Sequence, residues 1–189
     1  MDLTTYVIIF IILLLLISGI FVVKQQTSAV IERFGKFIAI RKPGLHFKIP
    51  IIDRIVGRVS LRILQLDVIV ETKTKDDVFV KIKVSVQYKV IKDKVFDAFY
   101  KLDFPQDQIT SYVFDVVRAE VPKMILDDVF EKKDDIAIAV KSELNDSMLN
   151  YGFDIIKTLV TDIDPDAQVK DSMNRINASE REKVAAQFE

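Results

Sequence analysis

The chain of 189 residues has no cysteine, only one histidine, and five residues each of glycine and proline. The absence of thiols excludes disulfides, thiol catalysis and thiolate metal sites, and it is compatible with either side of a membrane. So few glycines and prolines exclude a long flexible linker or a low-complexity tract, and no internal repeat is visible. The composition therefore suits one domain with its own core, or two small subdomains that share one.

Patterns that carry chemistry are equally scarce. His46 has no second histidine to join it in a metal or nucleophilic site, and we expect a local structural role for it in the turn Pro43–Phe47. No Gly-rich phosphate loop occurs. We therefore expect no catalytic residue, no metal and no cofactor.

One long hydrophobic run opens the chain. Eighteen consecutive residues without charge, Tyr6–Val23, would extend about 27 Å as a helix, close to the thickness of a bilayer core. A signal peptide does not fit, because only Asp2 precedes the run and no A-x-A cleavage site follows it. We expect a membrane anchor that spans the bilayer, with a re-entrant insertion as the alternative. Its anchor positions are taken to be Tyr6, Ile12, Leu16 and Val23.

Charge is distributed unevenly after this run. Residues 24–62 contain nine basic and two acidic side chains, whereas residues 63–189 contain 18 basic and 25 acidic ones. Basic flanks stay on the cytoplasmic side, which predicts a single-pass topology with the N-terminus outside and the domain inside. Cations near the surface are attracted to anionic headgroups, and lipid is a simpler partner for them than nucleic acid. The predicted membrane-surface residues are Lys24, Arg33, Lys36, Arg41, Lys42, Lys48, Arg54 and Arg58.

The first part of the soluble region has the period of β-strands. Apolar residues alternate with polar ones from Val78 to Val90, which predicts a strand with one buried face. Its predicted partner is 62–72, joined to it by a polar connection. A shorter hairpin is predicted at 28–33 and 37–41, around Phe34, Gly35 and Lys36. These short connections predict an antiparallel sheet.

Helical periods follow the strands. The predicted helices are 93–101, 106–121 and 133–151, with a short turn at 127–130 and Gly152 as a stop. Phe153–Ile163 is predicted to be one more strand. Asp164 and Pro165 then have the pattern of an N-cap followed by proline at the first helical position, so a last helix is expected to begin there.

This last helix has an apolar stripe and no C-cap. Val169, Met173 and Ile176 could dock on the domain, and a charged, uncapped helix gains stability by packing on a neighbour. We favour self-association over a frayed terminus. The predicted oligomer contacts are Met173, Ile176, Val184 and Phe188.

A family pattern is carried by 60–67, 71–80, 97–102, 112–119, 121–122 and 126–131, together with 43–47, 162–165 and 173–178. These segments together resemble the SPFH (band 7) domain of the stomatin, prohibitin and flotillin superfamily, and most closely the hypersensitive-induced-reaction proteins. The resemblance runs from about Gln26 to Phe188.

The resemblance implies an α+β fold: an SPFH domain with an antiparallel sheet and packed helices, preceded by a membrane helix and followed by a helix that drives oligomers. The implied boundaries are 1–24 for the anchor, 25–165 for the SPFH domain and 166–189 for the start of the oligomerisation helix. Two departures stand out. The related plant proteins rely on lipidation near the N-terminus instead of a hydrophobic helix. The long coiled coil of the family does not follow here, which fits either a truncated chain or a minimal form with reduced assembly.

The expected function is that of a non-enzymatic, membrane-anchored scaffold that organises a membrane microdomain or its protein clients. Its expected partners are membrane lipids, other copies of the chain and an unknown membrane-protein client, without nucleic acid. The alternative is an adaptor that regulates one membrane protease or channel.

Overall fold

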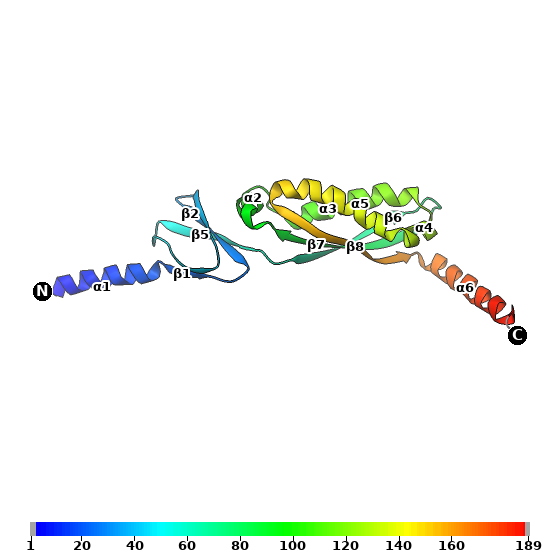
Figure 1. Ribbon diagram of the computed structural model, residues 1–189, viewed down its shortest axis with the longest axis horizontal. Helices are drawn as coiled ribbons and strands as arrows, with labels where there is room; N and C mark the ends of the chain where they lie inside the picture. Colours follow the sequence, from blue (N-terminus) through cyan, green and yellow to red (C-terminus); the bar gives the residue numbers. More distant parts are fainter. Residues whose placement is uncertain (1–2, 188–189) are drawn as a thin grey trace. The chain divides into compact units, whose positions relative to one another are not determined.

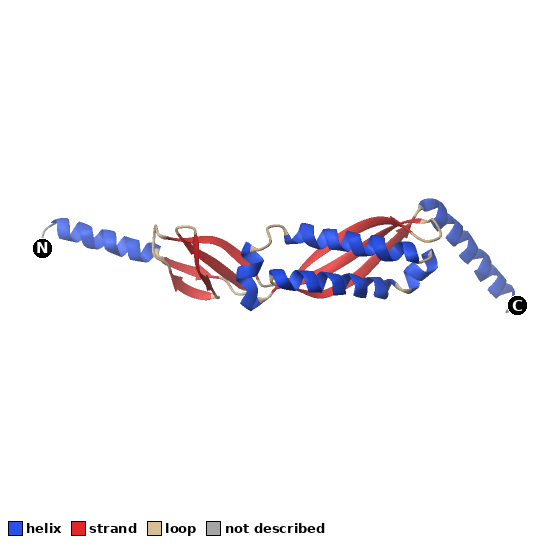
Figure 2. Ribbon diagram, turned by 90° about the horizontal axis from the view of Figure 1, so that it is seen from above, coloured by secondary structure: helices blue, strands red, loops and turns tan. Residues whose placement is uncertain are grey.

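The computed structural model describes residues 3–187 and consists of two compact units (Figures 1 and 2). Unit 1 comprises the residues up to 64 together with 88–103 and 148–154. Unit 2 comprises 65–87, 104–147 and the residues from 155 onward. Both units contain strands and helices, so the α+β class predicted from the sequence is confirmed.

Unit 1 is built from a helix and two small antiparallel sheets. β1 pairs with β4, and β2 lies between β3 and β5. The predicted hairpin around Gly35 is confirmed, and Ala29, Val30 and Ile31 at the centre of β2 are fully buried. The elements are α1 (Leu3–Ser18), β1 (Ile20–Val23), β2 (Thr27–Arg33), β3 (Lys36–Arg41), β4 (Gly44–Phe47) and β5 (Asp53–Ser60).

The prediction of one continuous helix from Tyr6 to Val23 is wrong. α1 ends at Ser18, and residues 20–23 form β1 instead, with Val23 only 2% exposed. Gly19 makes the transition: it is buried, and a Cβ there would meet the ring of Phe47 and lie 2.6 Å from the Lys48 carbonyl oxygen. Within residues 3–187, no helix is both long enough and apolar enough to cross a membrane.

A cluster of aromatic rings joins α2 (Val95–Tyr100) to the sheet of unit 1, after the short 3-10 turn η1 (Lys92–Lys94). Phe37 meets Phe96 edge to face, with ring centroids 4.9 Å apart. The Tyr100 hydroxyl donates a hydrogen bond of 2.6 Å to the Glu32 carboxylate. Burial, and secondarily this hydrogen bond, raises the pKa of Tyr100 to about 12.

Unit 2 is a three-stranded sheet in the order β6-β7-β8, with α3 and α5 lying side by side across one face (Figure 2). The last residues of β7 (88–90) and the first residues of β8 (153–154) belong to unit 1. The elements are β6 (Leu64–Lys73), β7 (Phe79–Val90), α3 (Pro105–Glu120), η2 (Val121–Lys123), α4 (Leu126–Glu131), α5 (Lys133–Met148), η3 (Leu149–Tyr151), β8 (Phe153–Pro165) and α6 (Ala167–Gln187).

The alternation predicted for β7 is confirmed. Val80, Ile82, Val84 and Val86 are at most 1% exposed, and they form the sheet's contribution to the core. The helices contribute buried residues at helical spacing, among them Ile109, Val113, Ile136 and Val140. Each such side chain contributes about 1.5–3 kcal/mol when fully buried.

The connection between β6 and β7 is fixed to the start of α4. The Thr74 N–H donates to the Val78 carbonyl over 2.9 Å, which closes the hairpin. The Asp76 carboxylate accepts hydrogen bonds from the Thr74 hydroxyl (2.6 Å) and from the Leu126 N–H (3.1 Å). The bond from Thr74 is the largest of the effects that lower the pKa of Asp76.

The start of the last helix differs from the prediction. β8 continues through Pro165, and α6 begins at Ala167. Asp166 takes the N-terminal position, because its carbonyl accepts the N–H groups of Val169 and Lys170, both at 3.0 Å. Asp164 instead pairs with the Lys170 ammonium at 3.0 Å. The predicted stop at Gly152 is confirmed, with a left-handed φ of 83°.

Gly57 allows α2 to approach β5, and replacing it should destabilise unit 1. A Cβ at this position would meet the Phe99 ring, with Cζ only 2.7 Å away. We expect Gly57→Val to lower the free energy of unfolding by about 1–3 kcal/mol, as is typical of overpacking, measured by urea denaturation. The double variant with Phe99→Ala should lose less than the sum of the two single losses. Unchanged stability of Gly57→Val would contradict this packing.

Asp67 should make the stability of unit 2 depend on pH under acidic conditions. Its carboxylate accepts hydrogen bonds from Lys83, Ser85 and Gln65, and these lower its pKa to about 2. The bond from Lys83 has the largest effect on this pKa, followed by those from Ser85 and Gln65. A lowered pKa stabilises the fold above the ordinary value near 3.8, and this contribution is lost as the pH falls from about 4 to about 2.

We expect Asp67→Asn to flatten the decline of the urea midpoint in this window. The control Asp171→Asn removes an exposed carboxylate from α6 and should keep the decline of the unmodified chain. Parallel curves for all three proteins would show that Asp67 is not the group responsible.

Candidate membrane-contact surface

In α1, the large apolar side chains from Tyr6 to Ile17 are exposed and not packed on other described parts of the chain. All twelve residues from Tyr6 to Ile17 are large, apolar and between 39% and 64% exposed. The predicted anchor positions Tyr6, Ile12 and Leu16 are among them, whereas Val23 is buried in β1. With 16 residues, α1 is about 24 Å long.

The ribbon formed by β1 and β4 continues this apolar surface. Ile20 pairs with Phe47, and Val22 pairs with Leu45. Alternate residues of a strand point to the same side, so these four side chains share one face of the ribbon. All four are about half exposed or more. His46 lies on the other face, with Nε2 2.6 Å from the Lys42 carbonyl oxygen.

An ion pair connects two turns at one end of the sheet β3-β2-β5. Arg33 Nε and Asp53 Oδ1 are 2.8 Å apart, and a second contact of 3.3 Å joins Nη2 to Oδ2. Asp53 also accepts the N–H of Ile49 at 2.9 Å, and its side chain is only 8% exposed. The pKa of Asp53 is lowered chiefly by the hydrogen bond from Arg33, and next by the hydrogen bond from the Ile49 N–H.

The two turns present large apolar side chains to solvent. Phe34, in the turn between β2 and β3, is 85% exposed, and Ile51, in the turn before β5, is 93% exposed. Both have left-handed backbones, with φ of 49° and 71°. Such conformations cost about 1–3 kcal/mol each, and they are rarest for a β-branched residue such as Ile51. The sequence signal that could have identified Ile51 is an apolar loop around Pro50.

The structure divides the predicted membrane-surface cations into two groups. Lys36, Lys48 and Arg54 lie beside the two turns, within three residues of Arg33 or five of Asp53. The others lie toward the opposite end of the strands or after β1: Lys24, Arg41, Lys42 and Arg58. Arg33 itself is engaged by Asp53 and is not available to a headgroup in the same way.

The predicted oligomer contacts on α6 are placed differently from one another. Met173 is half-buried and, with Val169 and Ile176, lines a groove of about 360 Å³ beside Val78 and Leu126. Ile176 and Val184 are 58% and 53% exposed. Phe188 lies outside the described residues.

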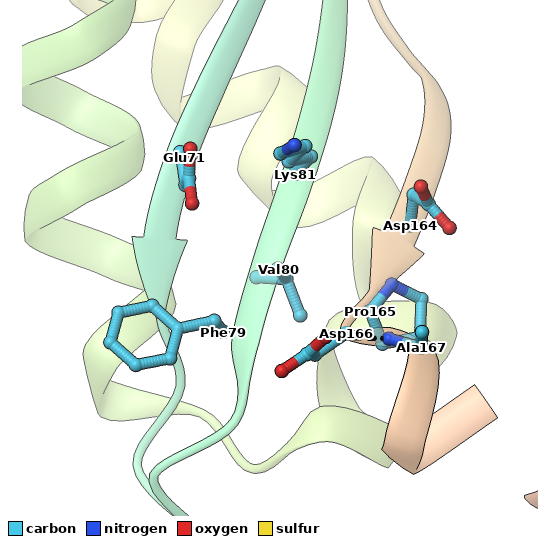
Figure 3. A pocket seen from close by; sticks show the side chains of 8 residues that line it. All are labelled: Glu71, Phe79, Val80, Lys81, Asp164, Pro165, Asp166 and Ala167. Carbon is cyan, nitrogen blue, oxygen red and sulfur yellow. Dashed lines mark hydrogen bonds between the residues drawn. The ribbon is translucent and has the colours of Figure 1, made fainter. Parts of the chain in front are cut away.

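A second hollow, of about 400 Å³, lies where β8 leads into α6 (Figure 3). Glu71, Lys81 and Asp164 line it from three neighbouring strands. The residues that line it include no serine, threonine, cysteine or histidine that could act as a nucleophile together with a histidine base. Asp166 is used in capping α6, through a bond of 2.7 Å from the Ala167 N–H. In residues 3–187, no group of three His, Asp or Glu side chains is arranged to hold a metal ion.

Comparison with known proteins finds relatives of similar sequence. Hypersensitive-induced response protein 4 of Arabidopsis thaliana is 47% identical over 167 residues, which cover 88% of this chain and 57% of the relative. The mitochondrial stomatin-like protein 2 of Homo sapiens is 31% identical over 168 residues, or 88% of this chain and 47% of the relative. Stomatin-like protein stl-1 of Caenorhabditis elegans is 30% identical over a segment of the same length, 51% of the relative.

The chain thus spans about half the length of these curated relatives. The model of the SPFH domain / Band 7 family matches residues 21–189, which include unit 2 and both sheets of unit 1 except for Ile20, the first residue of β1. The resemblance noted in the sequence is therefore confirmed, and the chain belongs to the SPFH (band 7) family.

Proposed function

We propose that this chain is a membrane-attached scaffold without chemistry of its own, and that copies of it associate through α6. The observation that supports attachment most directly is α1, whose apolar residues are exposed on every side. Twelve such side chains carry more hydrocarbon than one myristoyl chain, which by itself gives only marginal membrane binding. Water is therefore an unfavourable surrounding for α1, and a bilayer supplies a favourable one.

The position of unit 1 on the membrane follows from its charge. The segment after α1 contains nine cations and two carboxylates over residues 24–62. Such a flank favours the cytoplasmic face, and the anionic lipids of that face attract it. We propose that α1 enters the bilayer from this side and that unit 1 rests on the headgroups.

Association of copies is proposed from α6. Its exposed Ile176 and Val184 lie on the same side of the helix as Met173, which lines a groove together with Val78 and Leu126. A helix with such a row of exposed apolar side chains is suited to packing on the same helix of another copy. A scaffold of many copies would then confine lipids or client proteins to one patch of membrane.

Charges placed on α1 should release the chain from membranes. Ile11→Asp together with Leu14→Asp puts two carboxylates into the apolar segment, each costing about 2.5–3.5 kcal/mol in a membrane interior. We expect flotation with liposomes to be lost, since the combined cost corresponds to a change on the order of 10⁴ in the partition constant. Ile69→Asp with Phe79→Asp, two exposed apolar residues of unit 2, is the matched control and should float normally. Flotation of the α1 variant would refute attachment through α1.

Charges placed on α6 should reduce assembly on the membrane. Ile176→Glu with Val184→Glu is expected to shorten the ladder of species obtained by chemical crosslinking of vesicle-bound protein, because it removes apolar contact and adds repulsion. Gln168→Glu with Asn174→Glu adds the same charge at exposed polar positions of α6 and should leave the ladder unchanged. A monomeric chain that copurifies with one different protein in fixed ratio would instead favour the adaptor role.

A further inference from the structure

Phe34 and Ile51 project from the same end of unit 1. In the register of the sheet, Arg33 pairs with both Lys36 and Asp53, so the turn that follows β2 and the turn that precedes β5 are neighbours. The ion pair between Arg33 and Asp53 connects their bases.

The base of α1 lies at this end as well. The Lys48 N–H donates a hydrogen bond of 2.8 Å to the Gly19 carbonyl, directly after α1. The next residue, Ile49, donates its N–H to the Asp53 carboxylate. A short series of hydrogen bonds therefore runs from the end of α1 to the turn that carries Ile51, and the apolar face of the β1–β4 ribbon begins at the same place, with Ile20 and Phe47.

The backbone of this region is organised to expose these side chains. Ile51 has a left-handed backbone that its branched Cβ disfavours, and the turn is closed by hydrogen bonds between Ile49 and Asp53 in both directions. A turn that only had to connect two strands could use glycine or asparagine at this position without strain. Apolar side chains at both tips are instead the pattern of a surface that meets a nonpolar partner.

The charges around the tips decide between the possible partners. Arg33 is paired with Asp53, and Glu32 accepts a hydrogen bond from the Tyr100 hydroxyl. The other charged groups beside the tips are cations: Lys36, Lys48 and Arg54. Contact between the tips of two copies would bring these cations together. An anionic lipid surface would neutralise them while the apolar tips enter below the headgroups.

We propose that Phe34 and Ile51 insert into the interfacial layer of an anionic bilayer beside α1, as a second lipid contact of this chain. The proposal rests on the membrane attachment proposed above and extends it from α1 to the folded body of unit 1. Lys36, Lys48 and Arg54 contact the headgroups around the two tips, and the Arg33–Asp53 pair holds the tips at the same end of the sheet.

Tryptophan reporters can test this directly, because the chain has no tryptophan of its own. Phe34→Trp and Ile51→Trp are prepared in the full chain and bound to vesicles of phosphatidylcholine and phosphatidylserine, with and without bromine on the acyl chains. Phe79→Trp and Ile69→Trp are matched controls, since they make the same substitutions at exposed positions of unit 2. Flotation of each variant is measured in the same samples.

We expect the emission of both tip reporters to shift to the blue on binding and to be quenched by the brominated lipids, while that of the controls stays unchanged. Variants that float but whose tip emission neither shifts nor is quenched would overturn the second contact and leave attachment through α1 standing. A chain that does not float would overturn both. A blue shift of the tip reporters before vesicles are added, unchanged by brominated lipid, would show that another copy covers the tips and would likewise overturn the proposal.

Discussion

The structure depends on where apolar surface is covered by protein and where it is not. In unit 2, the apolar residues of the sheet and of α3 and α5 cover one another, and Ile82, Val84, Ile109 and Ile136 are fully buried. In unit 1, the residues from Tyr6 to Ile17 have no such cover. Each large apolar side chain gains about 1.5–3 kcal/mol on full burial. Exposing the twelve side chains of α1 to water is therefore the largest free-energy cost on the described surface. The proposed attachment to a membrane rests on this contrast.

The Arg33–Asp53 pair has a role that its exposure alone would not suggest. Surface ion pairs contribute little to stability, but here the carboxylate is nearly buried and also accepts the N–H of Ile49. The pair therefore fixes the geometry of two turns as well as their charge. Left-handed backbones at Phe34 and Ile51 persist only where the surroundings hold them, and this network supplies that restraint for the turn of Ile51.

Sequence patterns predicted the elements whose cause is local. The alternation along β7 and the stop at Gly152 depend on neighbours in the chain, and both were predicted correctly. The end of α1 depends on a partner more than twenty residues away: residues 20–23 are apolar enough for a helix, but pairing with β4 makes them a strand. The two turns that carry Phe34 and Ile51 also depend on a distant contact, because the ion pair between their bases joins residues twenty positions apart. Uniform hydrophobicity therefore could not show where the helix stops.

Attachment and association are connected by the cost of bringing copies together. The exposed Ile176 and Val184 would contribute about 1.5–3 kcal/mol each if fully buried, whereas association in solution costs about 4–15 kcal/mol in lost translational and rotational freedom. Between two copies, these side chains from both α6 helices would together contribute about 6–12 kcal/mol, a range that overlaps the cost of association, so contact through α6 alone is marginal for a free chain. If copies attach to a bilayer through α1, as proposed, the bilayer would confine and orient them, so that the same contacts would act at a high effective concentration. In the proposed scaffold, the apolar stripe of α6 would therefore associate more strongly on a membrane than away from one.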